Sequence, residues 1–353
     1  LVLDDSLPDA SFQADRTMVH LMKAASRREV AGAIPYGDRG YIHLVVNGRS
    51  FGVYEHVIPV DDDYLERSFG LDGGELYKVD NHYEVTDGGG ERWIKGSWNY
   101  SLNKEDLRFT FKKRTREKED DYSGLVELLG LLDPGRTPNG AFDARAGEVI
   151  DLEGWLRALA VYRTAADWDA PGGTTGKNVY LYRPPGGLWK MIPWDHDVAL
   201  GAWPPNPGGF EAATAPIHLG LFPMISRLLL RPAFERELTR SIQHLLQGAY
   251  DPVELRPIID STHAFLAATP AATAPTCPTA LPPERPCYQA PDRMRSYTSA
   301  RWGYLRGAVN DPLAFTITTS GGERFSAART PVVLRGLAPM AVESIARGGE
   351  RLA

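Results

Sequence analysis

The residues best suited to chemistry lie in one stretch of the chain, residues 167–201. The stretch contains one asparagine and four aspartates: Asn178, Asp167, Asp169, Asp195 and Asp197. Carboxylates that converge repel one another unless a cation or protons lie between them. Hard oxygen ligands of this kind are those that Mg²⁺ and Mn²⁺ prefer. The stretch therefore favours a divalent-cation site, provided that the fold brings these side chains together.

A β-hairpin within the stretch is predicted to bring its two halves together. Residues 178–182 (NVYLY) and 188–192 (LWKMI) carry the aromatic and branched side chains typical of strands. Between them, residues 183–187 (RPPGG) combine the fixed φ of proline with the positive φ open to glycine, so the chain is expected to turn back. The hairpin would place Asn178, at the start of one strand, beside Asp195, just after the end of the other.

Aspartate and asparagine beside a hairpin are also ordinary turn formers, and this simpler interpretation has to be weighed against a metal site. Asp195 and Asp197, however, do not lie in a polar turn. The apolar residues 192–194 (IPW) precede them and residues 198–200 (VAL) follow. Four carboxylates around one hairpin in such surroundings favour the metal site.

The order of these residues is that of the catalytic half of a protein kinase: a base aspartate, an asparagine, a hairpin and a metal-binding aspartate. The usual HRD and DFG letters are absent. The segments WDAPGG, NVYLY and WKMIPWDHDVALG are instead similar to the signature of the CotH family, the atypical kinases related to spore coat protein H. Upstream, residues 45–70 and 74–80 resemble the NGxxxGxY and LYK stretches of that family. The similarity covers roughly residues 1–310.

The resemblance implies a secreted protein, or one of the cell surface or spore coat, that transfers the γ-phosphate of ATP to hydroxyl side chains of proteins. Its cofactors would be ATP and Mg²⁺ or Mn²⁺. By the motif match, Asp169 falls on the catalytic aspartate, Asn178 on the asparagine before the YLY strand, and Asp195 on the metal-binding aspartate. In this interpretation Asn178 and Asp195 hold the metal ions that bridge the phosphates.

Four further residues near the motifs have open roles. Asp197 either completes the metal shell or caps the turn that follows it. Asp167 is a rival base, although the match to WDAPGG selects Asp169. His196 is expected to point away from the metal because successive side chains alternate in direction. Lys78, in the ELYK segment, either contacts a phosphate or is an ordinary solvated lysine.

The expected fold is α+β, with the two lobes of an atypical protein kinase. Residues 1–60 would form part of a small strand-rich lobe, including a hairpin with the turn Asn47-Gly48. Residues 61–312 would form a larger helical lobe that carries the catalytic hairpin, and residues 313–353 the start of a β-sandwich-like segment. Helices are predicted near residues 9–28, 122–132, 151–166, 219–230, 233–247, 252–267 and 291–309.

The start of the chain departs from the kinase pattern. Kinase chemistry uses a glycine-rich loop over the phosphates and a lysine on a strand of the small lobe. Residues 1–40 contain no such loop, and Lys23 lies in a predicted helix. In the CotH family these parts lie upstream of the point where this sequence begins, so a truncated N-terminus is expected. Residues 55–60 would form the hinge that holds adenine, with Ile58 where relatives tend to carry glutamate.

Composition argues against two other classes of protein. The formal net charge of −6 offers no bulk attraction to nucleic acids. No apolar run reaches the about 18 residues that indicate a transmembrane helix.

Cys277 and Cys287 flank a proline-rich loop, and a disulfide between them fits the oxidising location that the resemblance implies. Two free thiols are the alternative.

Two other functions remain open on the sequence. D-x-D pairs also hold Mn²⁺ and a nucleotide sugar in glycosyltransferases, although nothing in the N-terminal region resembles a doubly wound nucleotide-sugar fold. A non-catalytic, kinase-like scaffold of a coat or surface is supported by the missing phosphate lysine. The retention of Asp169, Asn178 and Asp195 opposes that second alternative.

Overall fold

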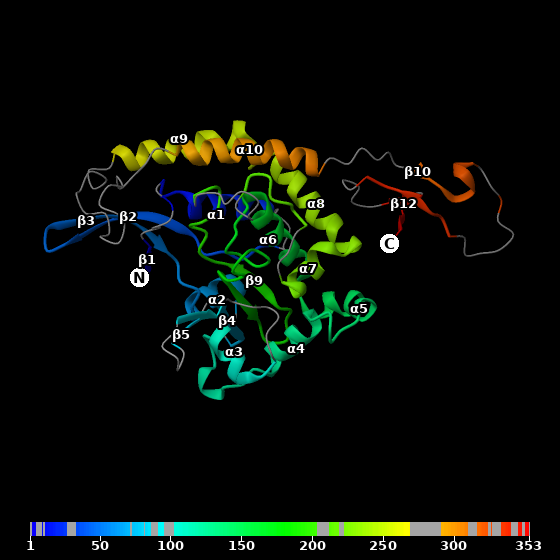
Figure 1. The fold of residues 1–353 in the computed structure, drawn as a ribbon, viewed down its shortest axis with the longest axis horizontal. Coiled ribbons are helices and arrows are strands. Elements are labelled where there is room, and N and C mark those ends of the chain that lie inside the picture. The colour runs from blue at the N-terminus through cyan, green and yellow to red at the C-terminus, as the bar shows by residue number, and fades with distance from the viewer. Residues whose placement is uncertain are drawn as a thin grey trace.

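The computed structural model shows a mainly helical body with several small antiparallel sheets, in agreement with the expected α+β class (Figure 1). It describes residues 2–4, 9, 11–26, 33–70, 73–80, 82–85, 91–94, 102–202, 212–218, 222–268, 291–309, 316–323, 326, 333–339, 345–347 and 350–352. The helices are α1 (Ala14–Ala25), α2 (Asp62–Phe69), α3 (Lys104–Thr110), α4 (Ser123–Leu132), α5 (Asn139–Val149), α6 (Leu152–Ala165), α7 (Pro223–Leu230), α8 (Pro232–Leu246), α9 (Pro252–Ala268) and α10 (Asp292–Ala308).

The strands fall into small sheets rather than one continuous sheet. They are β1 (Val2–Asp4), β2 (Arg39–Val46), β3 (Arg49–Val57), β4 (Glu75–Val79), β5 (His82–Val85), β6 (Glu91–Ile94), β7 (Phe111–Lys113), β8 (Val179–Arg183), β9 (Lys190–Pro193), β10 (Thr316–Ile317), β11 (Gly336–Leu337), β12 (Ile345–Arg347) and β13 (Glu350–Leu352).

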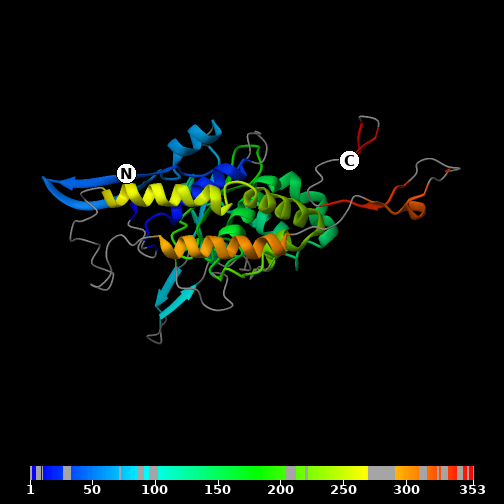
Figure 2. The same cartoon turned by 90° about the horizontal axis from the view of Figure 1, so that it is seen from above.

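A three-stranded sheet of order β1-β3-β2 forms the N-terminal part of the structure. The predicted β2–β3 hairpin is confirmed, and Val46 pairs with Arg49 across its turn. Asn47 and Gly48 both have positive φ, 52° and 76°, as a two-residue hairpin turn of this kind requires. The hairpin projects away from the helical body in both views (Figures 1 and 2).

The predicted hairpin of residues 178–192 is also confirmed, and it belongs to a four-stranded sheet of order β7-β4-β8-β9. Val179 of β8 lies opposite Pro193 of β9, so the two strands are paired up to the ends that carry the candidate site. Strand β4, which contains the ELYK segment, pairs antiparallel with β8 and places Lys78 opposite Tyr180. The two motif regions noted in the sequence therefore share one sheet.

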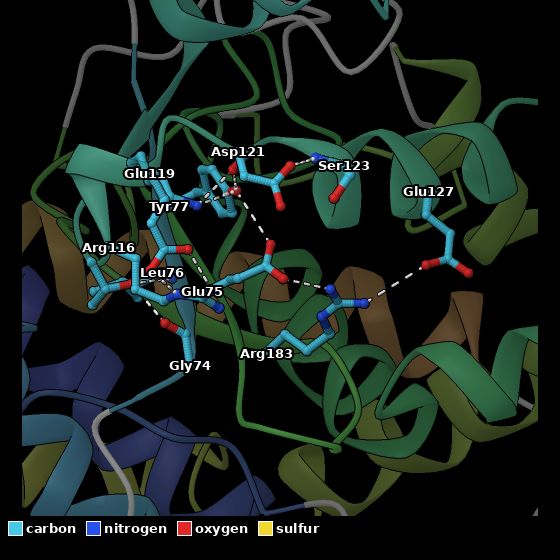
Figure 3. Close-up of polar contacts among 12 residues, drawn as sticks. Gly74, Glu75, Leu76, Tyr77, Arg116, Glu119, Asp121, Ser123, Glu127 and Arg183 are labelled. Carbon is cyan, nitrogen blue, oxygen red and sulfur yellow. Dashed lines mark hydrogen bonds and ion pairs between the residues drawn. The ribbon is translucent and has the colours of Figure 1, made fainter.

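Polar contacts fix the other end of this sheet to helix α4 (Figure 3). Arg183, at the end of β8, forms an ion pair with Glu75 of β4, and its second amino group lies 3.7 Å from Glu127 of α4. The hydroxyl of Tyr77 donates to the carbonyl of Asp121 at 3.0 Å, and the carboxylate of Asp121 accepts from the first backbone N–H of α4 at 2.9 Å. These contacts hold β4 and β8 in register.

Helix α6 forms the centre of the core and leads directly into the candidate site. Every residue from Gly154 to Ala165 is buried, and the helix packs against α1, α8, α10 and β9. Asp151 caps its start as predicted, accepting from the backbone N–H of Gly154, and also binds the ammonium of Lys190 at 2.8 Å. At the other end Ala166 takes a left-handed conformation, with φ of 50°, that turns the chain toward Asp167.

The C-terminal end of α6 is anchored by α10. Arg301 of α10 is buried and donates to the carbonyls of Arg163 and Thr164 at 2.6 and 3.3 Å. The same guanidinium donates to the carbonyls of Ala213 and Ala215. One buried arginine thus satisfies carbonyls that the end of a helix leaves without an intrahelical partner. Helices α9 and α10 lie side by side along one face of the molecule (Figures 1 and 2).

The helix predictions are confirmed within a few residues, whereas α2, α3 and α5 had not been predicted. Strand β3 continues through Val57 and so covers the first residues of the segment expected as a hinge, residues 55–60, whose contact with adenine stays a prediction. Within residues 313–353, expected to begin a β-sandwich-like segment, the described strands form two two-stranded sheets, β10-β11 and β12-β13. In both views β10 to β13 lie apart from the helical body (Figures 1 and 2).

Two further predictions concern the disulfide and membrane-spanning helices. Cys277 and Cys287 lie outside the described residues, so their disulfide stays a prediction. In the described part of the chain, no helix is both long and apolar enough to cross a membrane.

Candidate active site

Asp169 lies in the loop after α6, with its side chain almost fully buried. One oxygen, Oδ2, lies 2.8 Å from the ammonium of Lys177 and accepts from the amide of Asn178 at 3.3 Å. The other, Oδ1, accepts from the hydroxyl of Thr175, which also donates to the Asp169 carbonyl at 3.0 Å. The carboxylate is therefore held in a fixed orientation by three neighbours from one loop.

Glycine allows this loop to close on itself. Gly172 has φ of +80°, and a Cβ there would collide with the guanidinium of Arg163; a Cβ at Gly173 would collide with the Trp168 carbonyl. The loop then closes through the backbone N–H of Lys177, which donates to the Asp169 carbonyl at 2.9 Å. This closure brings Lys177, eight residues after Asp169 in the sequence, back beside the aspartate.

Asn178 joins the two ends of the hairpin, as the sequence predicted. Its amide nitrogen donates to the backbone carbonyl of Asp195 at 2.9 Å, and its amide oxygen accepts from the ammonium of Lys177 at 2.8 Å. Asn178 and Asp195 both have left-handed backbones, with φ of 60° and 58°. Residues other than glycine adopt this backbone conformation uncommonly. Where they do, the surrounding structure holds them in it, often at functional sites.

The carboxylates of Asp195 and Asp197 lie in an environment that disfavours their charge. Burial, with the neighbouring Asp15, raises the pKa of Asp195 to about 6. Burial, with the neighbouring Asp195, raises the pKa of Asp197 to about 9. Shifts in this direction arise when carboxylates gather without enough positive charge nearby. Their oxygen donors fit Mg²⁺ or Mn²⁺, while the ligand roles of Asn178, Asp195 and Asp197 stay predictions.

The structure adds a cluster of three acidic residues around one arginine, all from the N-terminal region. The sequence had not indicated this cluster. Asp15 of α1 lies 2.8 Å from the guanidinium of Arg39, which begins β2. The same guanidinium lies 3.1 Å from Glu55 of β3 and 3.6 Å from Asp4 of β1. Burial, with the neighbouring Asp15, raises the pKa of Glu55 to about 8. The carboxylates of Asp4, Asp15 and Glu55 thus all contact the guanidinium of Arg39.

His196 connects that N-terminal cluster to the loop after α6. Its backbone N–H donates to Asp15 at 2.7 Å, and its ring nitrogen Nδ1 lies 2.8 Å from Oδ2 of Asp167. Both side chains are buried. Asp167 is thus occupied by the histidine, whereas Asp169 faces Lys177 and Asn178, which favours Asp169 over Asp167 as the base.

The two lysines of this region lie in different surroundings. Lys78 lies in β4, with its ammonium 3.6 Å from Asp80 and its side chain about one quarter exposed, at 23%. Lys177, which the sequence had not singled out, is the lysine whose ammonium contacts both Asp169 and Asn178. Its place directly before Asn178 is the only signal that sequence offered, and a lysine in a Gly/Thr loop normally indicates a solvated residue.

Comparison with known proteins identifies the family to which the chain belongs. The model of the family described as CotH kinase protein matches residues 1–305. Inner spore coat protein H of Bacillus subtilis (strain 168) is 25% identical over 228 residues, which cover 62% of this chain. The aligned part spans 56% of that protein, little more than half its length. Because the family model matches most of the sequence, the chain belongs to the CotH kinase protein family.

Proposed function

We propose that the protein is an ATP-dependent kinase that transfers the γ-phosphate to hydroxyl side chains of proteins of a spore coat or cell surface. The observation that carries the proposal is the contact of Asp169 with Lys177 and Asn178, at the open end of a hairpin that also presents Asp195. Family membership supports it. The coat location is suggested by the relative, Inner spore coat protein H.

Asp169 is suited to orient the attacking hydroxyl and to accept its proton. The hydroxyl oxygen would form a bond to the γ-phosphorus while the bond to the bridging oxygen breaks, releasing ADP, and the proton would pass to the carboxylate. Oδ1 and Oδ2 are held by Thr175 and Lys177, so the carboxylate does not need to reorganise. A preorganised group of this kind lowers the barrier without first losing entropy.

Lys177 supplies a cation for the phosphates. Burial opposes its charge, but the adjacent Asp169 outweighs burial and raises the pKa of Lys177 above its usual value. The lysine is therefore charged at neutral pH, with its side chain 21% exposed. A cation beside the base can stabilise negative charge on the transferring phosphoryl group. Lys78, across the ladder from Tyr180, is a second candidate for the same role.

The carboxylates suit a divalent cation that accompanies the nucleotide. Asn178, Asp195 and Asp197 are the residues that would hold it, in keeping with the resemblance to kinases. A bound Mg²⁺ or Mn²⁺ would neutralise charge on the phosphates. In the two-lobed arrangement proposed for this chain, the nucleotide would lie between the β1-β3-β2 sheet and the helical body, over the end of the β8–β9 hairpin.

Transfer of labelled γ-phosphate from ATP to a hydroxyl-rich protein, with Mg²⁺ or Mn²⁺, tests the proposal on the full-length protein. We expect transfer by the wild type and its loss in Asp169→Asn. Binding of ATP and metal without any transfer would instead indicate a non-catalytic scaffold. Thermal protection by a UDP-sugar with Mn²⁺, and none by ATP, would indicate a glycosyltransferase.

A further inference from the structure

Three carboxylates from distant parts of the chain meet beside the catalytic loop. Asp4 ends β1, Asp15 lies in the first turn of α1, and Asp195 follows β9. Each offers one oxygen, and these three oxygens all lie within 4.8 Å of one another. Oxygens bound to one Mg²⁺ at about 2.1 Å are separated by about 3–4 Å, so only a small contraction separates this arrangement from a ligand set.

The carboxylate of Asp15 has a free oxygen at this position. Oδ1 is occupied, because it accepts from the His196 N–H at 2.7 Å and lies 2.8 Å from Arg39. Among the residues that the structure describes, Oδ2 has no hydrogen-bond partner, although Asp15 is only 1% exposed. A buried carboxylate oxygen without a donor is unfavourable unless another ligand satisfies it. Oδ2 is therefore the atom available to a cation.

The neighbouring arginine does not supply enough charge. Arg39 contacts Asp15 and Asp4, but it also contacts Glu55 at 3.1 Å. Lys177, the other cation of the site, is in contact with Asp169. Among the residues that the structure describes, the Arg39 guanidinium thus interacts with four carboxylates, those of Asp4, Asp15, Glu55 and Asp195. A divalent cation would remove most of the remaining negative charge.

We propose that Asp4, Asp15 and Asp195 bind one divalent cation, Mg²⁺ or Mn²⁺, and that this site fills without nucleotide. The ligands differ from the set expected from the kinase resemblance, because two of the three come from β1 and α1. The cation would join the N-terminal sheet and α1 to the loop that carries Asp195. Its part in catalysis rests on the proposed kinase function, whereas its binding does not.

Titration of the full-length protein with Mn²⁺ alone, with free Mn²⁺ followed by electron paramagnetic resonance, tests the site. We expect the wild type to remove about one equivalent from solution. Asp4→Asn should weaken binding at least tenfold, since even second-sphere changes cost about 10–100-fold in metal affinity. Asp4 is the most informative position because its side chain is partly exposed, at 28%, and the change is expected to leave the fold intact.

Two matched variants sharpen the test. Asp15→Asn keeps an oxygen for the His196 N–H and should also lose Mn²⁺. Asp38→Asn changes an exposed carboxylate that pairs with Lys23 of α1, outside the cluster, and should bind Mn²⁺ as the wild type does. Circular-dichroism melting of each variant separates lost binding from lost folding.

The outcomes distinguish this site from the kinase proposal. Absence of Mn²⁺ binding in the wild type, or binding that Asp195→Asn removes and Asp4→Asn leaves unchanged, would overturn the site. Mn²⁺ binding that needs Asp4, in a protein that transfers no phosphate, would support the site and contradict the kinase proposal. Phosphate transfer by a protein whose Mn²⁺ binding is unchanged in Asp4→Asn would support the kinase proposal and contradict the site.

Discussion

His196 and Asp167 form a buried pair in which Nδ1 of the imidazole lies 2.8 Å from Oδ2 of the carboxylate. The pair connects the loop after β9 to the loop after α6, and the backbone of His196 continues the connection to Asp15. Two aspartates that lie two residues apart therefore have different partners. Asp167 contacts the histidine, whereas Asp169 contacts Lys177 and Asn178.

Replacing Asp167 tests this structural role. Asp167→Ala would leave the buried ring N–H of His196 without an acceptor, which typically costs about 1–3 kcal/mol of unfolding free energy. Asp167→Asn retains an acceptor oxygen and should cost clearly less. Urea unfolding of both variants measures the difference. Equal stability of the two would show that the hydrogen bond contributes nothing at this position.

The sequence was sufficient where the signals are local. Asn178 and Asp195 could be placed together because a hairpin with a Pro/Gly turn joins these two positions. The capping role of Asp151 and the Asn47-Gly48 turn depend on the same short-range rules. Each of these predictions required only that neighbouring residues adopt their preferred backbone conformations.

The rest of the site depends on contacts between distant segments. Asp15 accepts from the backbone of His196, 181 positions further along the chain, and nothing in the neighbourhood of Asp15 indicates that contact. By itself an aspartate in the first turn of a helix is explained by the helix dipole. Arg39 at the start of a strand is equally unremarkable. Only the packing of α1 and β2 against the loop after β9 brings Asp15 and Arg39 into the candidate site.

Helix α2 was not predicted because its sequence is mostly polar. Helix α2 has a capping aspartate, Asp61, which accepts from Tyr64 N at 3.0 Å, and it ends at Gly70 with φ of 71°. Both signals are present in the sequence, but the helix itself is rich in acidic residues and buries only Tyr64 and Leu65. With so short an apolar stripe, hydrophobic periodicity did not reveal it.

The metal-free protein is expected to lose stability as pH rises. The folded-state pKa values of Asp195, Glu55 and Asp197 are raised to about 6, 8 and 9, above those of the unfolded chain. Between about pH 4 and pH 9 the folded state therefore binds more protons than the unfolded state, and the unfolding free energy falls as pH increases.

Urea unfolding at pH 5, 7 and 9, in the presence of a chelator, measures this slope. Asp197→Asn should flatten it and should stabilise the metal-free protein at pH 9. Saturating Mg²⁺ should also flatten it, because a bound cation favours the ionised carboxylates. A stability that rises with pH over this range would contradict the proposed charge crowding.

Asp195→Ala is expected to separate metal binding from folding. In the wild type, Mg²⁺ or Mn²⁺ with ATP should raise Tm, because a ligand that binds only the folded state stabilises it. The variant should lose that rise. Without metal it should be as stable as the wild type or more so, since one of the crowded carboxylates is gone. An unchanged metal-induced rise in Tm would remove Asp195 from the site.

Lys177→Met is expected to reduce transfer more than Lys78→Met. Removing one preorganised group that stabilises transition-state charge typically costs about 10²–10³-fold in kcat. Lys177→Arg retains the charge and should recover part of the loss. Steady-state kinetics of the three variants, with melting curves to exclude unfolding, makes the comparison. If Lys78→Met loses as much as Lys177→Met or more, the phosphate-facing cation is Lys78.

Asp169→Asn gives the most direct test of catalysis. The substitution keeps the shape and leaves one acceptor oxygen, for either Thr175 or Lys177, but it removes the charge and most of the basicity of the side chain. Loss of a positioned acid–base group typically costs about 10²–10⁴-fold in rate, so kcat should fall by about that factor. Nucleotide affinity should change little if Asp195 and its neighbours carry the metal, and a fall in kcat at constant affinity marks an interaction made in the transition state.

The control for this experiment is Asp167→Asn, which alters the neighbouring carboxylate while keeping an acceptor for His196. It should lose far less activity than Asp169→Asn, because the histidine separates Asp167 from the substrate side of the site. Labelled-phosphate transfer and isothermal titration with ATP measure the rate and the affinity on the same preparations. Wild-type rates in Asp169→Asn, or an equal loss in Asp167→Asn, would show that the base is not Asp169.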